Sequence, residues 1–337
     1  PSSAASDVYK RQEDHSVDTK YIRAAAEALA PHLKPGALVV LESTSPPGTT
    51  EDMAKHLVEL RPDLSLNDED DNAIFIAHCP ERVLPGKIME EMENNDRVIG
   101  GLTPKGAQLA RDLYSTFCTA DLLVTNATTA EMAKLTENSF RDVNIAFANE
   151  LSLICDRLGI DVWELIELAN HHPRVNILQP GPGVGGHCIA VDPWFIVSAA
   201  PEEAKLIKTA RTVNDGKPEW VIDQVLKALE AKDHPVVAAL GIAFKNDIDD
   251  LRESPSLEIV KRLAVDNPEL DIRVVEPNVQ ELPPVLNNLS NLTKQDAADA
   301  IAAAEVVLLL VNHKEFVALD KTVLQGKTVI DTKGIWR

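Results

Sequence analysis

The chain has 337 residues, a hydrophobic content of 45% and a formal net charge of −20 at pH 7. This length leaves room for two or three domains, and the composition is that of an ordinary soluble protein. The negative charge argues against nucleic acid or an anionic membrane as a partner, and no apolar run approaches the roughly 18 residues of a membrane span. The four cysteines fit a reducing cytoplasm and lack the spacing of metal ligands.

Residues 1–12, PSSAASDVYKRQ, have no apolar periodicity, and we interpret them as an extraneous leader. Residues 19–33 then have the spacing of an amphipathic helix, and residues 37–41, ALVVL, indicate a buried parallel strand. No GxGxxG run, the glycine-rich phosphate loop found after the first strand of many dinucleotide-binding sheets, occurs in this sequence.

Two polar segments follow the first strands of this expected sheet. The segment ESTSPPGTT comes after residues 37–41, and Thr49 or Thr50 is expected to cap the next helix. The strand expected over residues 73–77 ends in HCPERVLPG. Ligands bind at the carboxyl ends of parallel strands, so both segments are candidate binding sites. Residues 98–101 and 122–125 are the last strands expected in this sheet.

Residues 128–158 have the apolar spacing of one long helix, which suggests a spine between domains or a dimer interface. Lys134, Asn138 and Arg141 lie on one stripe of it, because they follow each other at helical spacing. Spacing alone does not distinguish an exposed basic stripe from a functional one. A second helix is expected over residues 162–169.

The C-terminal part alternates strands with helices and predicts a second doubly wound sheet. Ser254 and Pro255 have the residue types of an N-cap and a first helical position. Three histidines, His171, His172 and His187, are not spaced like metal ligands, so no metal site is expected. We expect strands at 235–240, 272–276, 306–311 and 328–331, and helices at 204–216 and on to residue 229.

A glycine-rich stretch, QPGPGVGGHCIAVDP at residues 179–193, stands between the two sheets in sequence. Its glycines and prolines exclude helix and strand and allow a ligand to lie against the main chain. The loop ends at Cys188, and if Cys188 opens a helix, Asp192 shares its face. A lone cysteine is more often structural, but its place after Gly-Gly-His favours a nucleophile.

The run GPGVGGHCIAVDP resembles the catalytic-cysteine loop of the UDP-glucose/GDP-mannose dehydrogenase family, and the resemblance extends over about residues 13–337. The flanking NHHPRVNILQ and PWFIV are most similar to the branch that acts on UDP-N-acetyl-D-mannosamine. The resemblance implies an NAD-dependent oxidation of a sugar's C6 alcohol to a carboxylate in two hydride transfers. It also implies a cytoplasmic homodimer that serves bacterial surface polysaccharide synthesis.

UDP-N-acetylglucosamine and GDP-mannose are alternative substrates. Relatives that oxidise UDP-glucose carry a second glutamate where this chain has Pro85, which favours an acetamido sugar. The implied domains are residues 13–126 for NAD, 127–220 for a central helical domain with the cysteine loop, and 221–337 for the nucleotide sugar. Relatives begin with further βα units and a glycine-rich phosphate loop, so by the resemblance this chain is expected to be truncated at its N-terminal side. The expected fold is α/β, with two Rossmann-like sheets, the first incomplete, joined by a helical domain with a long spine helix.

By the same resemblance, Cys188 is the nucleophile and Lys134 stabilises developing oxyanions. Asn138 is a partner of the catalytic water, which Asp192 and Glu81 position or deprotonate.

Cofactor and substrate contacts are implied in the same way. Thr44 and Glu81 are expected beside the nicotinamide of NAD, while Arg252 approaches NAD from the last domain. Lys333 is a weaker candidate for a contact at the rim of the cleft. The implied nucleotide-sugar contacts are Arg82, Val83, Leu84, Lys134, Asn138, Arg141, Arg174, Gly183, Gly185, Gly186 and Lys245.

Two other functions compete with this interpretation. Without a phosphate loop, the chain as printed is expected to bind NAD hardly at all, and it would then be an inactive fragment that binds nucleotide sugar or dimerises. A β-hydroxyacid dehydrogenase shares the Rossmann-plus-helical layout. That class does not explain a cysteine in a Gly-Gly-His loop.

Overall fold

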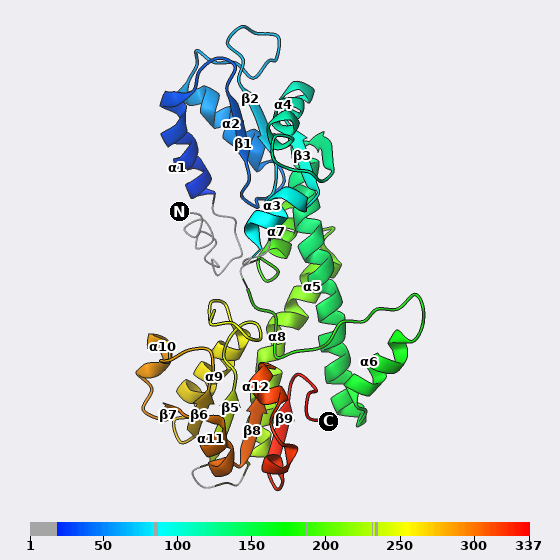
Figure 1. Cartoon of the computed structure of the whole chain (residues 1–337), viewed down its shortest axis with the longest axis vertical. Coiled ribbons are helices and arrows are strands. Elements are labelled where there is room, and N and C mark those ends of the chain that lie inside the picture. Colours follow the sequence, from blue (N-terminus) through cyan, green and yellow to red (C-terminus); the bar gives the residue numbers. More distant parts are fainter. Residues whose placement is uncertain (1–18, 84–86, 187, 231, 233–234) are drawn as a thin grey trace. The chain divides into compact units, whose positions relative to one another are not determined.

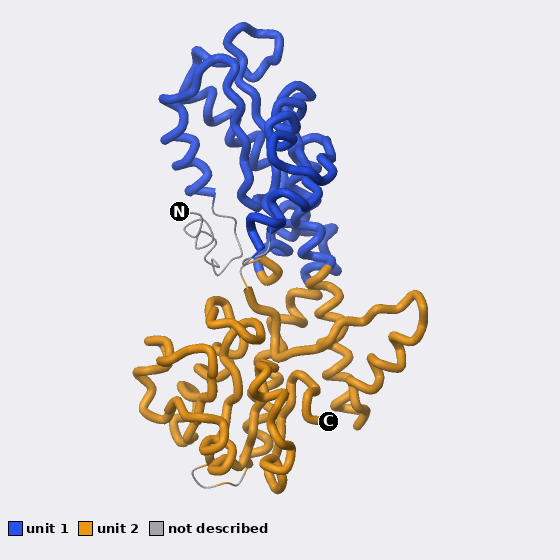
Figure 2. The backbone as a smooth tube through the Cα atoms, in the orientation of Figure 1, with its two compact units in different colours: residues 1–140, 191–208 blue, residues 141–190, 209–337 orange. Residues whose placement is uncertain are grey.

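A computed structural model describes residues 19–83, 87–186, 188–230, 232 and 235–337. The expected leader at 1–12, the predicted contact Leu84 and the neighbouring Pro85 lie outside the described residues. The chain divides into two compact units (Figure 2). Unit 1 comprises residues 1–140 and 191–208, and unit 2 comprises residues 141–190 and 209–337.

Unit 1 is built on a four-stranded sheet in the order β1-β2-β3-β4. The β1–β2 and β3–β4 pairs are parallel, whereas β2 and β3 are antiparallel. Its strands are β1 (Leu38–Leu41), β2 (Phe75–His78), β3 (Arg97–Gly101) and β4 (Leu122–Asn126). Its helices are α1 (Lys20–Leu29), the short η3 (Ala30–His32), α2 (Thr49–Leu60), α3 (Ile88–Asn94), α4 (Pro104–Tyr114) and α7 (Asp192–Ala199), with the first part of α5 (Ala127–Leu158).

Helices cover both faces of this sheet, because its central strands are apolar on both sides. Ile74 and Ile76 pack with Leu57 of α2 on one face. On the other face Ala77 and Ile99 pack against α4. The strands expected at 37–41, 73–77, 98–101 and 122–125 are all present, so the sequence located this sheet correctly.

The start of α2 differs from the expectation of a threonine cap. The N-cap is Gly48, with a left-handed φ of 95°. The buried carboxylate of Glu131, on α5, accepts hydrogen bonds from the N–H groups of Gly48 (2.6 Å) and Thr50 (2.7 Å) and from the Thr50 hydroxyl (2.6 Å). The carboxylate of Glu131, far away in sequence, therefore accepts the hydrogen bonds that an N-cap side chain would accept. The prediction that Thr49 or Thr50 caps this helix was wrong.

Unit 2 contains a five-stranded, all-parallel sheet in the order β7-β6-β5-β8-β9 (Figure 1). Apolar side chains fill both of its faces, which confirms a second doubly wound sheet. Its strands are β5 (Val236–Leu240), β6 (Asp271–Val275), β7 (Leu292–Lys294), β8 (Val306–Leu309) and β9 (Thr328–Asp331). Its shorter helices are α6 (Val162–Asn170), α9 (Pro255–Asp266), α10 (Pro284–Asn287), α11 (Ala297–Ala303), α12 (Lys314–Val317) and η4 (Lys321–Leu324).

Two long helices complete the fold. The helix expected at 128–158 is α5, of 32 residues. The helices expected from 204 to 229 form one helix, α8 (Lys205–Ala228), which contains Pro218 in its interior. Ser254 caps α9 and Pro255 is its first residue, as predicted. None of the helices in the described part of the chain is long and apolar enough to cross a membrane.

Candidate active site

Three of the predicted catalytic residues lie together in unit 1. Lys134 and Asn138 are on α5, and Asp192 is the first residue of α7. The side-chain amide of Asn138 donates a hydrogen bond of 2.5 Å to Asp192 Oδ2. Burial raises the pKa of Asp192 to about 6, while the bond from Asn138 and the positive charge of Lys134 act in the opposite direction. A carboxyl group poised near neutral pH is suited to general acid–base work.

The segment after β2 places Glu81 and Arg82 against their own main chain and α5. Glu81 Oε1 accepts the N–H groups of Arg82 (2.6 Å) and Val83 (2.8 Å). The Arg82 guanidinium forms an ion pair of 2.6 Å with Glu137 on α5. Arg82 and Lys134 border the same polar hollow, of about 450 Å³. The two cations share this hollow with the carboxylates of Asp96 and Glu137.

The polar groups at the carboxyl edge of β1 and β2 fit the nicotinamide side of NAD. Thr44 follows β1, and Glu81 follows the neighbouring parallel strand β2. Between them in sequence, Ser45 and His78 are buried, and neither the Ser45 hydroxyl nor the His78 ring has a hydrogen-bond partner among the described residues. Burial lowers the pKa of His78 to about 4. Such orphaned groups are what an edge that receives a ligand is expected to carry.

In unit 2, the glycine loop is held at both ends by main-chain hydrogen bonds. The N–H of Gly181 donates to Asn149 Oδ1 (2.9 Å), and the N–H of Gly186 donates to the carbonyl of Glu253 (3.3 Å). A Cβ at Gly185 would lie 2.5 Å from that same carbonyl oxygen. Gly186 has a left-handed φ of 89°. Side chains are therefore excluded at these two positions by close packing and by backbone angle.

Asn149 is itself fixed by a buried relay that the sequence did not reveal. Its amide donates to Asn214 Oδ1 (2.8 Å), and the amide of Asn214 donates to Asp142 Oδ1 (2.8 Å). The guanidinium of Arg211, on α8, pairs with the same carboxylate at 2.5 Å. Each amide can be oriented in only one way, because the Gly181 N–H can only donate. The only sequence signal was polar residues on the apolar faces of two helices.

Cys188 is the first described residue after His187, which lies outside the described residues. It is exposed, whereas Cys79, Cys118 and Cys155 are buried. The following helix, α7, begins at Asp192 after a turn, so the condition that Cys188 opens a helix, under which Asp192 would share its face, is not met. An exposed thiol next to a fixed glycine loop is accessible to a substrate.

The remaining predicted contacts are distributed over unit 2. Gly183 is packed so that a Cβ would lie 2.8 Å from Pro255. Lys245 is exposed in the connection between β5 and α9, and Arg252 forms an ion pair of 2.7 Å with Asp250. Arg141 and Arg174 are exposed on α5 and in the 171–179 loop.

Lys333 follows β9, and its amino group lies 3.1 Å from the point where a Gly181 Cβ would be. Burial lowers the pKa of Lys333 to about 8. Within the described ranges, no group of three or more His, Cys, Asp or Glu side chains is placed to hold a metal ion.

Comparison with known proteins assigns the class. Residues 10–118 match the NAD binding domain, residues 128–216 the central domain and residues 238–337 the UDP binding domain of one dehydrogenase family. Together with the two Rossmann-like sheets, these matches define an NAD-dependent dehydrogenase of nucleotide sugars. The chain belongs to the UDP-glucose/GDP-mannose dehydrogenase family.

Individual relatives are similar over almost the whole chain. This chain is 57% identical over 334 residues to the UDP-N-acetyl-D-mannosamine dehydrogenase of Salmonella typhi. The match covers 96% of this chain and 79% of that protein. It is also 57% identical over 328 residues to an NDP-N-acetyl-D-galactosaminuronic acid dehydrogenase of Ralstonia solanacearum, covering 96% and 76%. The solved UDP-D-ManNAc dehydrogenase of Pyrococcus horikoshii superposes with a TM-score of 0.83 at 37% identity, covering 96% of this chain and 75% of that one.

Proposed function

We propose that this enzyme oxidises the C6 alcohol of UDP-N-acetyl-D-mannosamine to the uronate through covalent intermediates on Cys188, for bacterial surface polysaccharide synthesis. The observation that carries the proposal is the exposed thiol of Cys188 at the end of a glycine loop fixed at both ends. The identity to mannosamine dehydrogenases supports the substrate. The division into residues 13–126 for NAD, 127–220 for the cysteine loop and 221–337 for nucleotide sugar is proposed with it.

The proposed reaction consists of two oxidations at C6 and one hydrolysis. Thr44 and Glu81 would hold the nicotinamide side of NAD, which would supply the hydride acceptor for both oxidations. The proton of the C6 hydroxyl passes to solvent in the first of them. The Cys188 thiolate adds to the aldehyde carbon and forms a C–S bond, giving a thiohemiacetal. Loss of the second hydride from that carbon leaves a thioester. Water then adds to the thioester carbon and the C–S bond breaks. The carboxylate departs, the Cys188 thiolate is regenerated, and the two protons of the water pass to solvent.

Charges in unit 1 support these steps. The positive charge of Lys134 stabilises the oxyanions that form when thiol and water add to the carbonyl carbon. Asp192, with its raised pKa and its bond to Asn138, accepts a proton from the attacking water, with Glu81 as a second carboxylate. Arg82, Val83, Leu84, Arg141, Arg174, Gly183, Gly185, Gly186 and Lys245 contact the nucleotide sugar, and Arg252 approaches NAD in this proposal.

A second sugar has its own support, since a galactosaminuronic acid dehydrogenase is as similar as the mannosamine enzyme. We expect kcat/KM to be highest with UDP-N-acetyl-D-mannosamine in a panel that includes the N-acetylgalactosamine, N-acetylglucosamine and GDP-mannose nucleotides. The reaction is followed as NADH absorbance. A higher kcat/KM with the galactosamine nucleotide would transfer the assignment to that sugar, and activity with none of them would contradict the proposed function.

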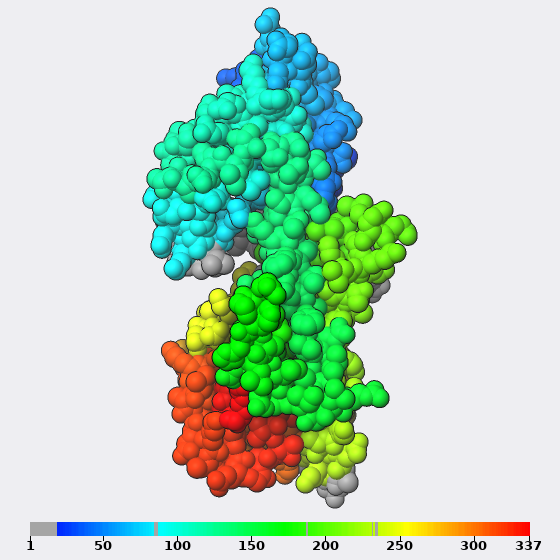
Figure 3. All heavy atoms as spheres, turned by 90° about the vertical axis from the view of Figure 1, so that its right-hand side faces the viewer, coloured from blue at the N-terminus to red at the C-terminus, as the bar shows by residue number. Residues whose placement is uncertain are grey.

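We also propose that the enzyme is a homodimer in the cytoplasm. Large apolar side chains are exposed on the part of α5 that belongs to unit 2: Phe147 is 53%, Ile154 45% and Leu158 63% exposed. They recur at helical spacing, and Figure 3 shows the green surface of α5 and α6 turned toward the viewer. A second copy would cover such a stripe. Four cysteines without a disulfide suit a reducing compartment.

A further inference from the structure

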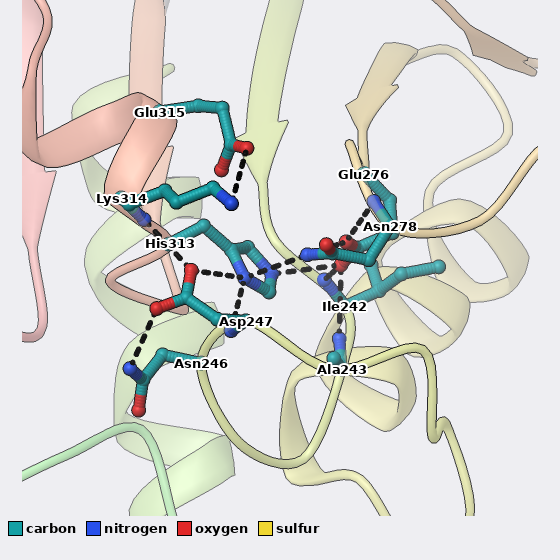
Figure 4. A network of polar contacts seen from close by, with 9 residues as sticks. All are labelled: Ile242, Ala243, Asn246, Asp247, Glu276, Asn278, His313, Lys314 and Glu315. Carbon is teal, nitrogen blue, oxygen red and sulfur yellow. Dashed lines mark hydrogen bonds and ion pairs between the residues drawn. The ribbon is translucent and has the colours of Figure 1, made fainter.

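The segment after β5 carries Lys245 between two tethered ends. On one side, the N–H groups of Ile242 and Ala243 donate to Glu276 Oε2 at 2.8 and 3.1 Å. On the other side, the N–H of Asp247 donates to His313 Nδ1 at 2.9 Å. Figure 4 shows these bonds converging from both ends of the segment. Lys245 itself is exposed, in the short stretch between the two tethers.

The two acceptors, Glu276 and His313, form one buried pair. Glu276 directly follows β6 and is 1% exposed, and His313, beyond β8, is fully buried. Their atoms His313 Nε2 and Glu276 Oε2 are 3.1 Å apart. Because Nδ1 accepts the N–H of Asp247, the ring proton is on Nε2 and is donated to Glu276. The Asn278 amide, 3.0 Å from Nδ1, lies beside the same ring.

The charge on Glu276 is stabilised inside the protein. Burial works against its ionised form, but the hydrogen bonds from His313 and the Ile242 N–H outweigh burial, so the pKa of Glu276 lies below its ordinary value. A buried carboxylate with three donors on one oxygen is a rigid anchor, since moving any donor would leave charge unpaired.

Asp247, whose N–H is bonded to His313, has an uncommon backbone conformation. Its φ of 59° is in the left-handed region, which a residue with a side chain adopts at a cost. Its carboxylate in turn accepts the N–H of Lys314, at the start of α12, at 2.9 Å. The turn after Lys245 is thus held by two independent hydrogen bonds, one from its main chain and one to its side chain.

The segment that carries Lys245 lies where doubly wound sheets bind their ligands. The segment lies at the carboxyl end of β5, which is flanked by β6 and β8, and β5–β8 is the point where the strand order reverses. Ligands of doubly wound sheets bind at such a point, and the acid after the second strand commonly binds ribose. Here the Glu276 carboxylate is bonded to groups of the protein itself instead. A nucleotide at this edge must be held by other groups, and Lys245 is a cation in the right segment.

We propose that the Glu276–His313 pair is a positioning device that presents Lys245 to the diphosphate of the nucleotide. The proposal rests on the role of Lys245 in the proposed function, but not on Cys188 or NAD. Glu276 and His313 do not contact the ligand. They act by fixing the main chain on either side of the lysine.

The test is a double-mutant cycle on UDP binding, measured by calorimetry on the enzyme without NAD. Lys245→Ala is expected to weaken UDP binding by about 10- to 100-fold, the loss of one charge-assisted contact. In His313→Gln the amide nitrogen can replace Nε2 as the donor to Glu276, but the amide oxygen cannot then also take the Nδ1 position that accepts the Asp247 N–H. We expect about a tenfold loss of affinity. In the Lys245→Ala background, His313→Gln should change the affinity less than about twofold.

Controls separate positioning from general loosening. Asn291→Ala removes hydrogen bonds to the carbonyls of Ala264 (3.0 Å) and Asn267 (3.3 Å), before β7 at the opposite end of the strands, and should leave UDP affinity unchanged. If His313→Gln does not fold, Glu276→Gln, which keeps the shape, enters the same cycle with the same expectation.

Each possible result of the cycle supports or overturns the positioning role. Equal losses in both backgrounds would show that His313 affects binding without Lys245 and would overturn the positioning role. A loss for Lys245→Ala with none for the His313 and Glu276 variants would also overturn it, while leaving the proposed function intact. No loss for Lys245→Ala would remove the role of Lys245 and the inference with it. Uronate production does not enter the measurement, so a failure of the cysteine mechanism is seen separately.

Discussion

Replacing Cys188 by serine should abolish uronate formation, with a loss of roughly 10³-fold or more in turnover. A serine hydroxyl is ionised far less than a thiol near neutral pH, and an alkoxide is a poorer leaving group when water opens the acyl intermediate. Uronate is measured by chromatography of the quenched reaction.

The matched control is Cys118→Ser. Cys118 is buried in unit 1, where its thiol lies 3.6 Å from the carbonyl of Asn95, and it has no part in the proposed chemistry. This variant should keep its turnover once folded. Turnover of Cys188→Ser at the rate of the unmodified enzyme would rule out covalent catalysis at this position.

Asp192→Asn should lose about 10²–10⁴-fold in turnover, the usual contribution of a general base. The substitution keeps the shape of the side chain and an oxygen that can accept the Asn138 bond. What it removes is the ability to take a proton from water. The rate is measured as NADH production at saturating substrate, and an unchanged rate would assign the proton transfer to another group.

The same variant should be more stable than the unmodified enzyme at pH 8. Burial raises the pKa of Asp192 from 3.8 to about 6, so the folded state binds its proton more tightly than the unfolded state. Stability from this group is therefore lost as the pH rises from about 4 through about 6, on the order of 2–3 kcal/mol in all. Asparagine avoids that loss.

Thermal denaturation at two pH values checks this expectation. The Tm of Asp192→Asn should exceed that of the unmodified enzyme at pH 8, and the difference should shrink as the pH is lowered toward 4. An equal difference at both pH values would mean that the gain does not come from the charge of Asp192. Lower activity with higher stability is typical of a group kept for chemistry rather than for folding.

Most of the fold could be predicted because its signals are local. The apolar runs at 37–41 and 235–240 are strands, and the long periodic stretch at 128–158 is one helix. The cap at Ser254 and the first helical position at Pro255 were also predictable, since each depends on a few adjacent residues.

What could not be predicted depends on partners that are far apart in sequence. The start of α2 is capped by Glu131, 81 residues from Thr50. Asn149 and Gly181 are 32 residues apart, and His313 and Glu276 are 37 apart. Nothing in the local pattern of either residue indicates the other, because only the folded chain brings them together.

The candidate site shows the same division. Helical spacing on α5 indicated that Lys134 and Asn138 share a stripe, and Asn138 does meet Asp192. The roles of these residues came from the family resemblance, since spacing cannot distinguish a functional stripe from an exposed one. The turn between Cys188 and α7 was not predictable, because glycine-rich segments have no periodic pattern to read.

The ratio of NADH formed to uronate formed tests the central claim most directly. UDP-N-acetyl-D-mannosamine is supplied in limiting amount with excess NAD, NADH is read by absorbance, and uronate and aldehyde are separated by chromatography. Two oxidations on a bound intermediate predict two NADH for each uronate and no free aldehyde at any time. One NADH for each sugar consumed, with aldehyde released into solution, would show a simple alcohol dehydrogenase and contradict the account.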